Sequence, residues 1–169
     1  GLSNDYLMHL AVGTSFAIIV PTSISSVLAH HKFKAVDFNI VKTYGLYAIL
    51  GAILGTIFTS TLKTEQLILF FVIVTFFLGV YLIFLKEKKI ESNLNFKTYY
   101  KIFFGFVSGF ISAPMGIGGA IMNVPVLKFF GFSINRAIGS AAAVGFLIAT
   151  TASIGFVITG NYKEINLPL

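Results

Sequence analysis

The hydrophobic positions of this chain form long uninterrupted runs, with the charged residues confined to the segments between them. Five runs are free of charged residues and long enough to cross the ~30 Å hydrocarbon core of a bilayer as helices, which takes about 20 residues each. They are Met8–Ala29, Thr43–Leu62, Gln66–Leu85, Ile102–Leu127 and Ala137–Gly160. The third run includes LILFFVIVTFFLGVYLIFL, which lacks the period-two alternation of a membrane β-strand. The pattern predicts an all-α integral membrane protein with five transmembrane helices.

The composition supports lipid as the main solvent of this chain. Of its 169 residues, 56% are hydrophobic and only 11% are charged, and the mean hydropathy is +0.90. A soluble domain carries roughly 25% charged residues, because polar groups must cover its core. The absence of cysteine excludes disulfides and thiolate chemistry. The formal net charge of +6 is scattered between the apolar runs and forms no compact patch, so nucleic acid is not an expected partner.

The basic residues fall mostly on one side if each run crosses the membrane once. Nine lysines lie in the connection 30–42, in the connection 86–101 or after Gly160, whereas the other side has Lys63, Lys128 and Arg136. Cytoplasmic connections carry an excess of Lys and Arg. We therefore expect a multi-pass membrane protein whose linker 86–101 is cytoplasmic.

A weak internal repeat relates the first and last runs. AVGTSFAIIV from Ala11 is similar to AIGSAAAVGF from Ala137, a shift of about 126 residues. If 102–130 crosses once, the copies are parallel and each repeat has four helices (4+4, eight in all). Residues 1–85 then hold the second to fourth helices of the first repeat, and 102–169 the first two of the second. If 102–130 is a re-entrant hairpin, the copies are inverted; the lysine distribution favours the parallel arrangement.

The fourth run is predicted to contain a broken helix. GFVSGFISAPMGIGGAIMNVPVLKFFGF includes two prolines and three closely spaced glycines. Unwound backbone at membrane depth persists only where protein or a water-filled cavity covers it, so a break near Ala113–Gly119 is a candidate substrate path. A helix that starts near Gly118–Ala120 would present free N–H groups and a positive dipole end, which favour an anion. Close helix packing and proline kinks are the structural alternative.

Polar residues near the break and on the repeated helices are candidates for substrate binding. The candidates are Gly116, Gly118, Gly119, Asn123, Thr14, Ser25, Ser140, Thr151 and Arg136. Thr14 and Ser25 lie about three turns apart, and the repeat maps them onto Ser140 and Thr151. Interhelical hydrogen bonds are the alternative for the hydroxyls and Asn123, and contact with lipid headgroups is the alternative for Arg136. The five runs contain no Asp or Glu, which favours an anion over a cation.

Three segments resemble a known family. SAPMGIGGAIMNVPVLKFFG and NRAIGSAAAVGF resemble the GxGGG, proline and AigtS pattern of the sulfite exporter TauE/SafE family, and AVGTSFAIIVPTSISSVLAHHKFKAVDF resembles the second helix of its first half. Ala120 stands where the third glycine usually lies. The resemblance implies about eight helices in two halves and a secondary transporter of the bacterial inner (plasma) membrane. Its expected activity is the export of a small anion such as sulfite, an organosulfonate or a related sulfur oxyanion. The chain would be an internal fragment that lacks the first glycine-rich helix.

Other functional classes remain open at this point. An anion channel would share the evidence for the fold, and a non-transporting membrane assembly subunit is a further alternative. An intramembrane serine protease would need a base for Ser108 in GFVSG, but no later run contains a histidine. We therefore expect no enzyme activity, cofactor or metal. The expected partners are a small anionic substrate, the lipid bilayer and a proton or another coupling ion.

Overall fold

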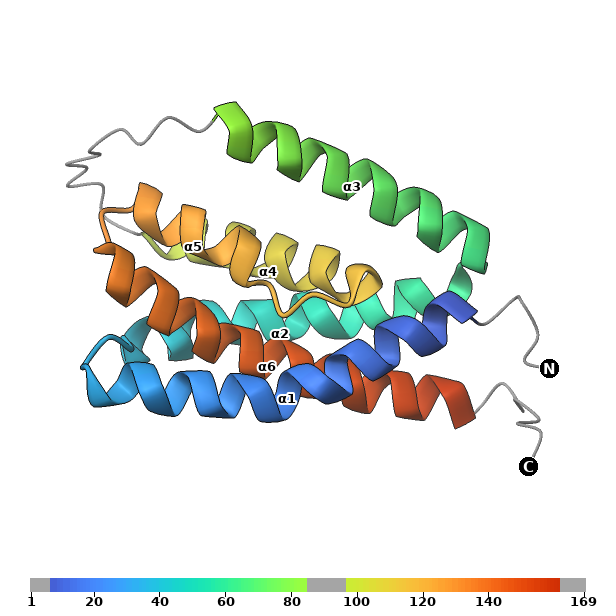
Figure 1. Ribbon diagram of the computed structural model, residues 1–169, viewed down its shortest axis with the longest axis horizontal. Helices are drawn as coiled ribbons and strands as arrows, with labels where there is room; N and C mark the ends of the chain where they lie inside the picture. Colours follow the sequence, from blue (N-terminus) through green and yellow to red (C-terminus); the bar gives the residue numbers. More distant parts are fainter. Residues whose placement is uncertain (1–6, 85–96, 162–169) are drawn as a thin grey trace.

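A computed structural model describes residues 7–84 and 97–161, which form six α-helices (Figure 1). The helices are α1 (Leu7–Lys32), α2 (Phe38–Thr61), α3 (Thr64–Phe84), α4 (Thr98–Met115), α5 (Ala120–Phe129) and α6 (Ile134–Asn161). Four of them, α1, α2, α3 and α6, are long and apolar enough to cross a membrane. The all-helical class predicted from the hydrophobic runs is confirmed. Most of the predicted linker, residues 86–96, lies outside the described residues.

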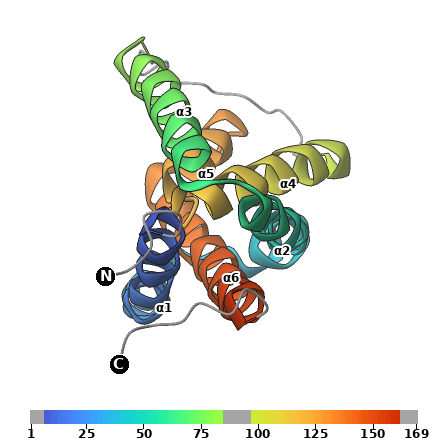
Figure 2. The ribbon, with the colours of Figure 1, turned by 90° about the vertical axis from the view of Figure 1, so that its right-hand side faces the viewer.

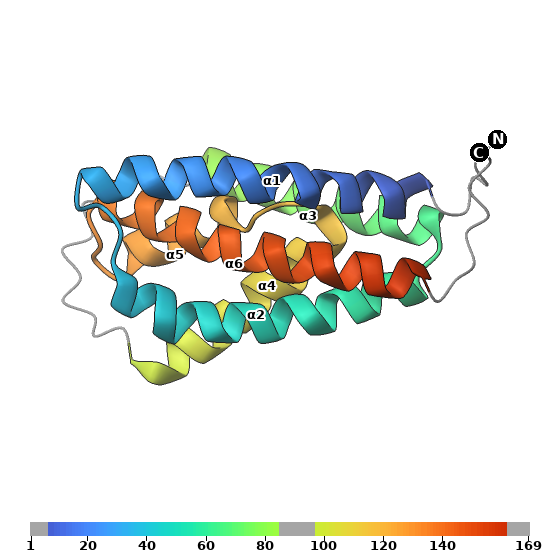
Figure 3. The ribbon, with the colours of Figure 1, turned by 90° about the horizontal axis from the view of Figure 1, so that it is seen from below.

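The fourth apolar run forms two shorter helices, and α5 turns back along α4. The break falls at Gly116–Gly119, within the predicted region. Three pairs of residues mark the reversal, with Ser112 beside Gly119, Ser108 bonded to Asn123, and the Tyr100 ring 5.2 Å from the Phe130 ring. Because the partners run in opposite order, both ends of the hairpin lie at the same end of the bundle (Figures 1 and 3). The prediction that Ile102–Leu127 crosses once, as a fifth transmembrane helix, is therefore wrong.

The repeated helices α1 and α6 lie side by side and run in opposite directions. A Cβ on Gly13 would lie 3.7 Å from Cβ of Phe156, and one on Gly139 would lie 3.2 Å from Cβ of His30. The two copies are therefore inverted, and the parallel arrangement favoured by the lysine distribution is wrong. The physical reason is the hairpin: it adds no crossing, so only α1, α2 and α3 cross between one copy and the next.

The hairpin also changes how the basic residues are distributed. Of the eight basic residues in 7–84 and 97–161, seven lie near one end of the bundle, where α1 ends and α2, α4 and α6 begin. They are Lys32, Lys34, Lys42, Lys97, Lys101, Lys128 and Arg136. The eighth, Lys63, lies at the opposite end. The predicted separation of Lys128 and Arg136 from the other lysines is wrong, and α6 ends at the end opposite the one predicted; Lys163 itself lies outside the described residues.

The glycines of α2 and α4 bring these two helices into backbone contact. Gly51 and Gly55 on α2 pack against the backbone of Phe106 and Phe110 on α4. Gly105 and Gly109 on α4 pack against the backbone of α2 near Ala48, and each glycine pair is spaced as in GxxxG membrane interfaces. A Cβ on Gly109 would overlap the carbonyl oxygen of Ala48 and lie 2.8 Å from its carbonyl carbon. The first arm of the hairpin is thus fixed on α2. By contrast, α3 stands apart from the other helices (Figure 2), with only 6% of its apolar segment buried.

The hairpin predicts which connections between helices are accessible from the same side of the membrane in the full-length protein. Ser133 follows α5, Lys34 lies between α1 and α2, and Lys63 lies between α2 and α3; all three are exposed. A membrane-impermeant maleimide should label Ser133→Cys and Lys34→Cys from the same side, and Lys63→Cys from the opposite side. Labelling of Ser133→Cys from the side of Lys63→Cys would contradict the re-entrant arrangement.

Candidate functional site

The helix break lies near the middle of the bundle, between α1 and α6 (Figure 3). A Cβ on Gly116 would lie 3.3 Å from Cβ of Ser15 on α1, and one on Gly118 would lie 3.1 Å from Cγ2 of Ile19 on the same helix. The Gly118 carbonyl oxygen packs against Gly145 on α6. The chain reversal thus sits at about half the length of the long helices, where the sequence predicted the substrate path.

Backbone conformation explains why glycines occupy this break. Gly116 has φ +67° and Gly119 has φ +72°, the left-handed region that L side chains rarely adopt. Gly116 ends α4 by donating its N–H to the carbonyl of Ser112. Gly119 precedes α5 and provides no side-chain cap, so the first turn of α5 keeps N–H groups without an intrahelical acceptor. The positive end of the α5 dipole is therefore at the break.

Asn123 is fully buried on α5, one turn after the break. Its Oδ1 accepts hydrogen bonds from the Tyr44 hydroxyl at 2.7 Å and from the Ser108 hydroxyl at 2.5 Å. Sequence reasoning missed both partners: Tyr44 was not among the candidate residues, and Ser108 was considered only as a nucleophile. The sequence did contain a signal for Ser108: it lies between Gly105 and Gly109, on the face of α4 that contacts α2. The Ser108 hydroxyl donates to an amide oxygen, which cannot act as the base a serine protease requires.

The four hydroxyls predicted to line a path do not gather at the break. Thr14 and Ser25 are exposed on α1, and each donates to a carbonyl of its own helix. Thr151 is half-buried and donates to the carbonyl of Leu147. Ser140 is buried, but its Oγ accepts a hydrogen bond from the Asp37 N–H at 2.9 Å. Binding by these hydroxyls stays a prediction for the whole protein, in which other segments can cover α1.

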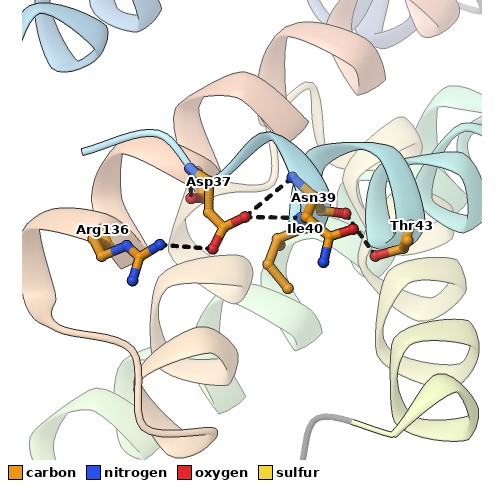
Figure 4. A network of polar contacts seen from close by, with 6 residues as sticks. Asp37, Asn39, Ile40, Thr43 and Arg136 are labelled. Atoms are coloured by element: carbon orange, nitrogen blue, oxygen red, sulfur yellow. Dashed lines mark hydrogen bonds and ion pairs between the residues drawn. The ribbon is translucent and has the colours of Figure 1, made fainter. Parts of the chain in front are cut away.

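Arg136 lies at the start of α6, in an ion pair away from the break. Its Nη2 is 2.9 Å from Oδ2 of Asp37, whose Oδ1 accepts from the N–H groups of Asn39 and Ile40 and so caps α2 (Figure 4). The Arg136 side chain is 55% exposed, and such a pair contributes about 0–1 kcal/mol. The anion contact of Arg136 stays a prediction; Arg136 lies at the lysine-rich end of the bundle, whereas the break lies near the middle.

The break is half-buried, and neither of two hollows on the surface of the bundle includes it. A cavity of about 200 Å³ lies between α3, α4 and α5, and a shallower cleft of about 390 Å³ follows α3. Phe104, Pro125 and Phe129 are among the lining residues of the first, and Gly116, Gly118, Gly119 and Asn123 line neither.

Long apolar helices around a glycine-rich helix break are typical of a multi-pass membrane protein. Comparison with known proteins gives the family directly. The chain matches the family described as "Sulfite exporter TauE/SafE" over residues 2–169. It therefore belongs to the TauE/SafE family, as the resemblance of the glycine-rich segment indicated.

Its curated relatives are named as probable membrane transporters. The chain is 29% identical over 154 residues to a "Probable membrane transporter protein" of Haemophilus influenzae, an alignment that covers 91% of this chain and 58% of the relative. It is 25% identical to YunE of Bacillus subtilis (95% and 66% covered) and 28% identical to MJ0441 of Methanocaldococcus jannaschii (96% and 64% covered). The chain thus spans about three fifths of these relatives' length. No solved structure matches it.

Proposed function

We propose that this chain forms part of a secondary transporter that exports a small anion, such as sulfite, an organosulfonate or a related sulfur oxyanion. The observation that carries the proposal is the helix break at mid-bundle, where the uncapped start of α5 and the amide of Asn123 offer hydrogen-bond donors. Donors at the positive end of a helix dipole favour an anion. The break Ala113–Asn123 would form one half of the substrate site.

The placement of the acidic residues supports an anionic substrate. Within the described residues the carboxylates are Asp37, which caps α2, and Glu65, in the first turn of α3. Neither contacts the break. Cation pathways and many proton relays use carboxylates inside the membrane, because a buried cation needs a counter-charge. Among residues 7–84 and 97–161, none supplies that counter-charge near Gly116–Asn123.

The basic residues support one orientation in the bacterial inner membrane. Seven of the eight described Lys and Arg residues lie near the end of the bundle where α4 begins and α5 ends. By the positive-inside rule, that end is cytoplasmic, and so is the connection from α3 to α4. In this orientation the hairpin enters from the cytoplasmic side and reaches the middle of the membrane.

The inverted pair α1 and α6 supports a second hairpin in the whole protein. In the second copy, the hairpin α4–α5 directly precedes α6; by the same symmetry, a matching hairpin would precede α1 and enter from the opposite side. Each of the two repeats then comprises a hairpin and three crossing helices, instead of the four crossing helices predicted from the sequence. Residues 1–85 would supply the crossing helices of the first repeat, and 102–169 the hairpin and first crossing helix of the second. The two hairpin tips would complete the site.

Flux measurements on the full-length protein in proteoliposomes would test the proposal. Sodium sulfite and sodium methanesulfonate should accumulate in vesicles against their gradients when a membrane potential or pH gradient is imposed, and choline and sodium should not. Flux that only dissipates a gradient would favour an anion channel. Absence of anion-dependent flux under any driving force would contradict both and favour an assembly subunit.

A further inference from the structure

A buried polar cluster of Tyr44, Ser108 and Asn123 connects α2, α4 and α5 beside the break. The Tyr44 side chain is fully buried, as are Ser108 and Asn123. The Tyr44 hydroxyl lies 2.7 Å from Oδ1 of Asn123 and 3.2 Å from the carbonyl oxygen of Phe104. Because a hydroxyl carries one hydrogen, the nearer acceptor, Asn123, receives the stronger bond.

In this structure the two hydroxyls of the cluster meet the oxygen side of the Asn123 amide. Two hydroxyls donate to Oδ1, so the amide nitrogen is turned away from both. Nδ2 is buried and has no hydrogen-bond partner among the described residues. A buried donor without an acceptor is unfavourable, and native proteins rarely keep one without a reason.

The unpartnered nitrogen faces the break. Nδ2 lies 3.0 Å from the point where a Cβ of Gly119 would stand, and Ser112 Oγ lies 3.2 Å from the same point. The carbonyl of Gly119 accepts from the N–H groups of Met122 and Asn123. The earlier N–H groups of α5, those of Ala120 and Ile121, have no intrahelical acceptor and belong to the same turn. Side-chain and backbone donors thus meet at the start of α5.

We propose that Tyr44 and Ser108 are positioning residues, which hold the Asn123 amide so that Nδ2 donates to the bound solute. This inference rests on the proposed function. It narrows the substrate class to anions that present a hydrogen-bond acceptor without a proton, such as the oxygen of a sulfite or sulfonate group. A solute that donates at this point, such as an ammonium or a protonated acid, would meet another donor and bind poorly.

Titration of sodium sulfite into the purified full-length transporter would test the amide orientation without requiring flux. Asn123→Leu removes the donor and should weaken binding about 10-fold. Asn123→Asp keeps the shape, but its ionised carboxylate offers only acceptors and repels an anion, so binding should weaken at least as much. If Asn123→Asp binds sulfite as tightly as the wild type, the amide carbonyl faces the break and the inference is wrong.

A double-mutant cycle separates positioning from a purely structural role. Tyr44→Phe and Ser108→Ala should each weaken sulfite binding about 3-fold in the wild-type background, and should change it no further in Asn123→Leu. Equal effects in the two backgrounds would overturn the positioning role. If the wild-type protein binds neither sulfite nor methanesulfonate, the proposed function fails and the inference fails with it; tight wild-type binding without coupling defeats the inference alone.

Discussion

Leucine in place of Gly109 should remove nearly all folded protein from the membrane. The Cβ of any side chain at this position would overlap the backbone of Ala48 and lie 2.8 Å from the nitrogen of Ala52, so the helix axes would have to separate. Overpacking of a closed interface costs about 3 kcal/mol or more, a large share of the stability of a small protein. Size-exclusion chromatography of the detergent-extracted, full-length protein would measure the folded fraction.

Gly79→Leu is the matched control for this experiment. Gly79 lies on α3, and a Cβ there would meet nothing within 4 Å. The same change in composition should therefore leave the amount of folded protein nearly unchanged. A folded fraction for Gly109→Leu equal to that of Gly79→Leu would show that α2 and α4 are not in backbone contact.

The second large effect is expected at the break. Gly118→Val should lower transport at least about 100-fold while the protein still inserts and folds, because misplacement of a site by about 1 Å already costs that much. A Cβ at Gly118 would stand 3.1 Å from Cγ2 of Ile19 and 3.8 Å from the carbonyl oxygen of Gly145. The Ile19 side chain can yield by a small shift, and the Gly145 carbonyl is already at ordinary contact distance, so the change should act on the shape of the site more than on the fold. Initial rates of sulfite uptake into proteoliposomes would measure it.

Gly118 is a better test position than its neighbours. Gly116 and Gly119 have positive φ, so any substitution there strains the backbone and mixes folding with transport. A bulky residue at Gly116 should also abolish transport, but with a larger loss of stability. Gly79→Val serves as control for the change of residue type. Full activity of Gly118→Val would defeat the assignment of the site to the break.

Hydropathy predicted where helices form but not how the broken run is oriented. The four long helices follow from apolar runs without charges, and the break follows from Pro114 and the clustered glycines. Whether the chain continues or reverses there depends on Gly116 and Gly119 both adopting the left-handed conformation. Composition does not reveal that choice, since a run of 26 residues is long enough for one span or for two half-length helices. The wrong repeat orientation and lysine distribution both followed from this one ambiguity.

The sequence predicted only those residues of the candidate site that lie close together along the chain. The glycines and Asn123 are close in sequence, and the structure keeps them together at the break. Tyr44 lies 79 positions from Asn123, and their contact depends on the glycine-mediated packing of α2 on α4. The spacing of Thr14 and Ser25 correctly placed them on one face of α1, but spacing alone does not tell whether that face turns inward. Both are exposed in the described residues.

The antiparallel pairing of α1 and α6 has an energetic consequence for a full-length transporter. Suppose that the two repeats have similar structures and face opposite sides of the membrane. The state open to one side then becomes the state open to the other side when the two repeats exchange their conformations. The two open states should therefore differ little in free energy when no gradient is present. A small bias from bound solute or membrane potential would then set the direction of net movement.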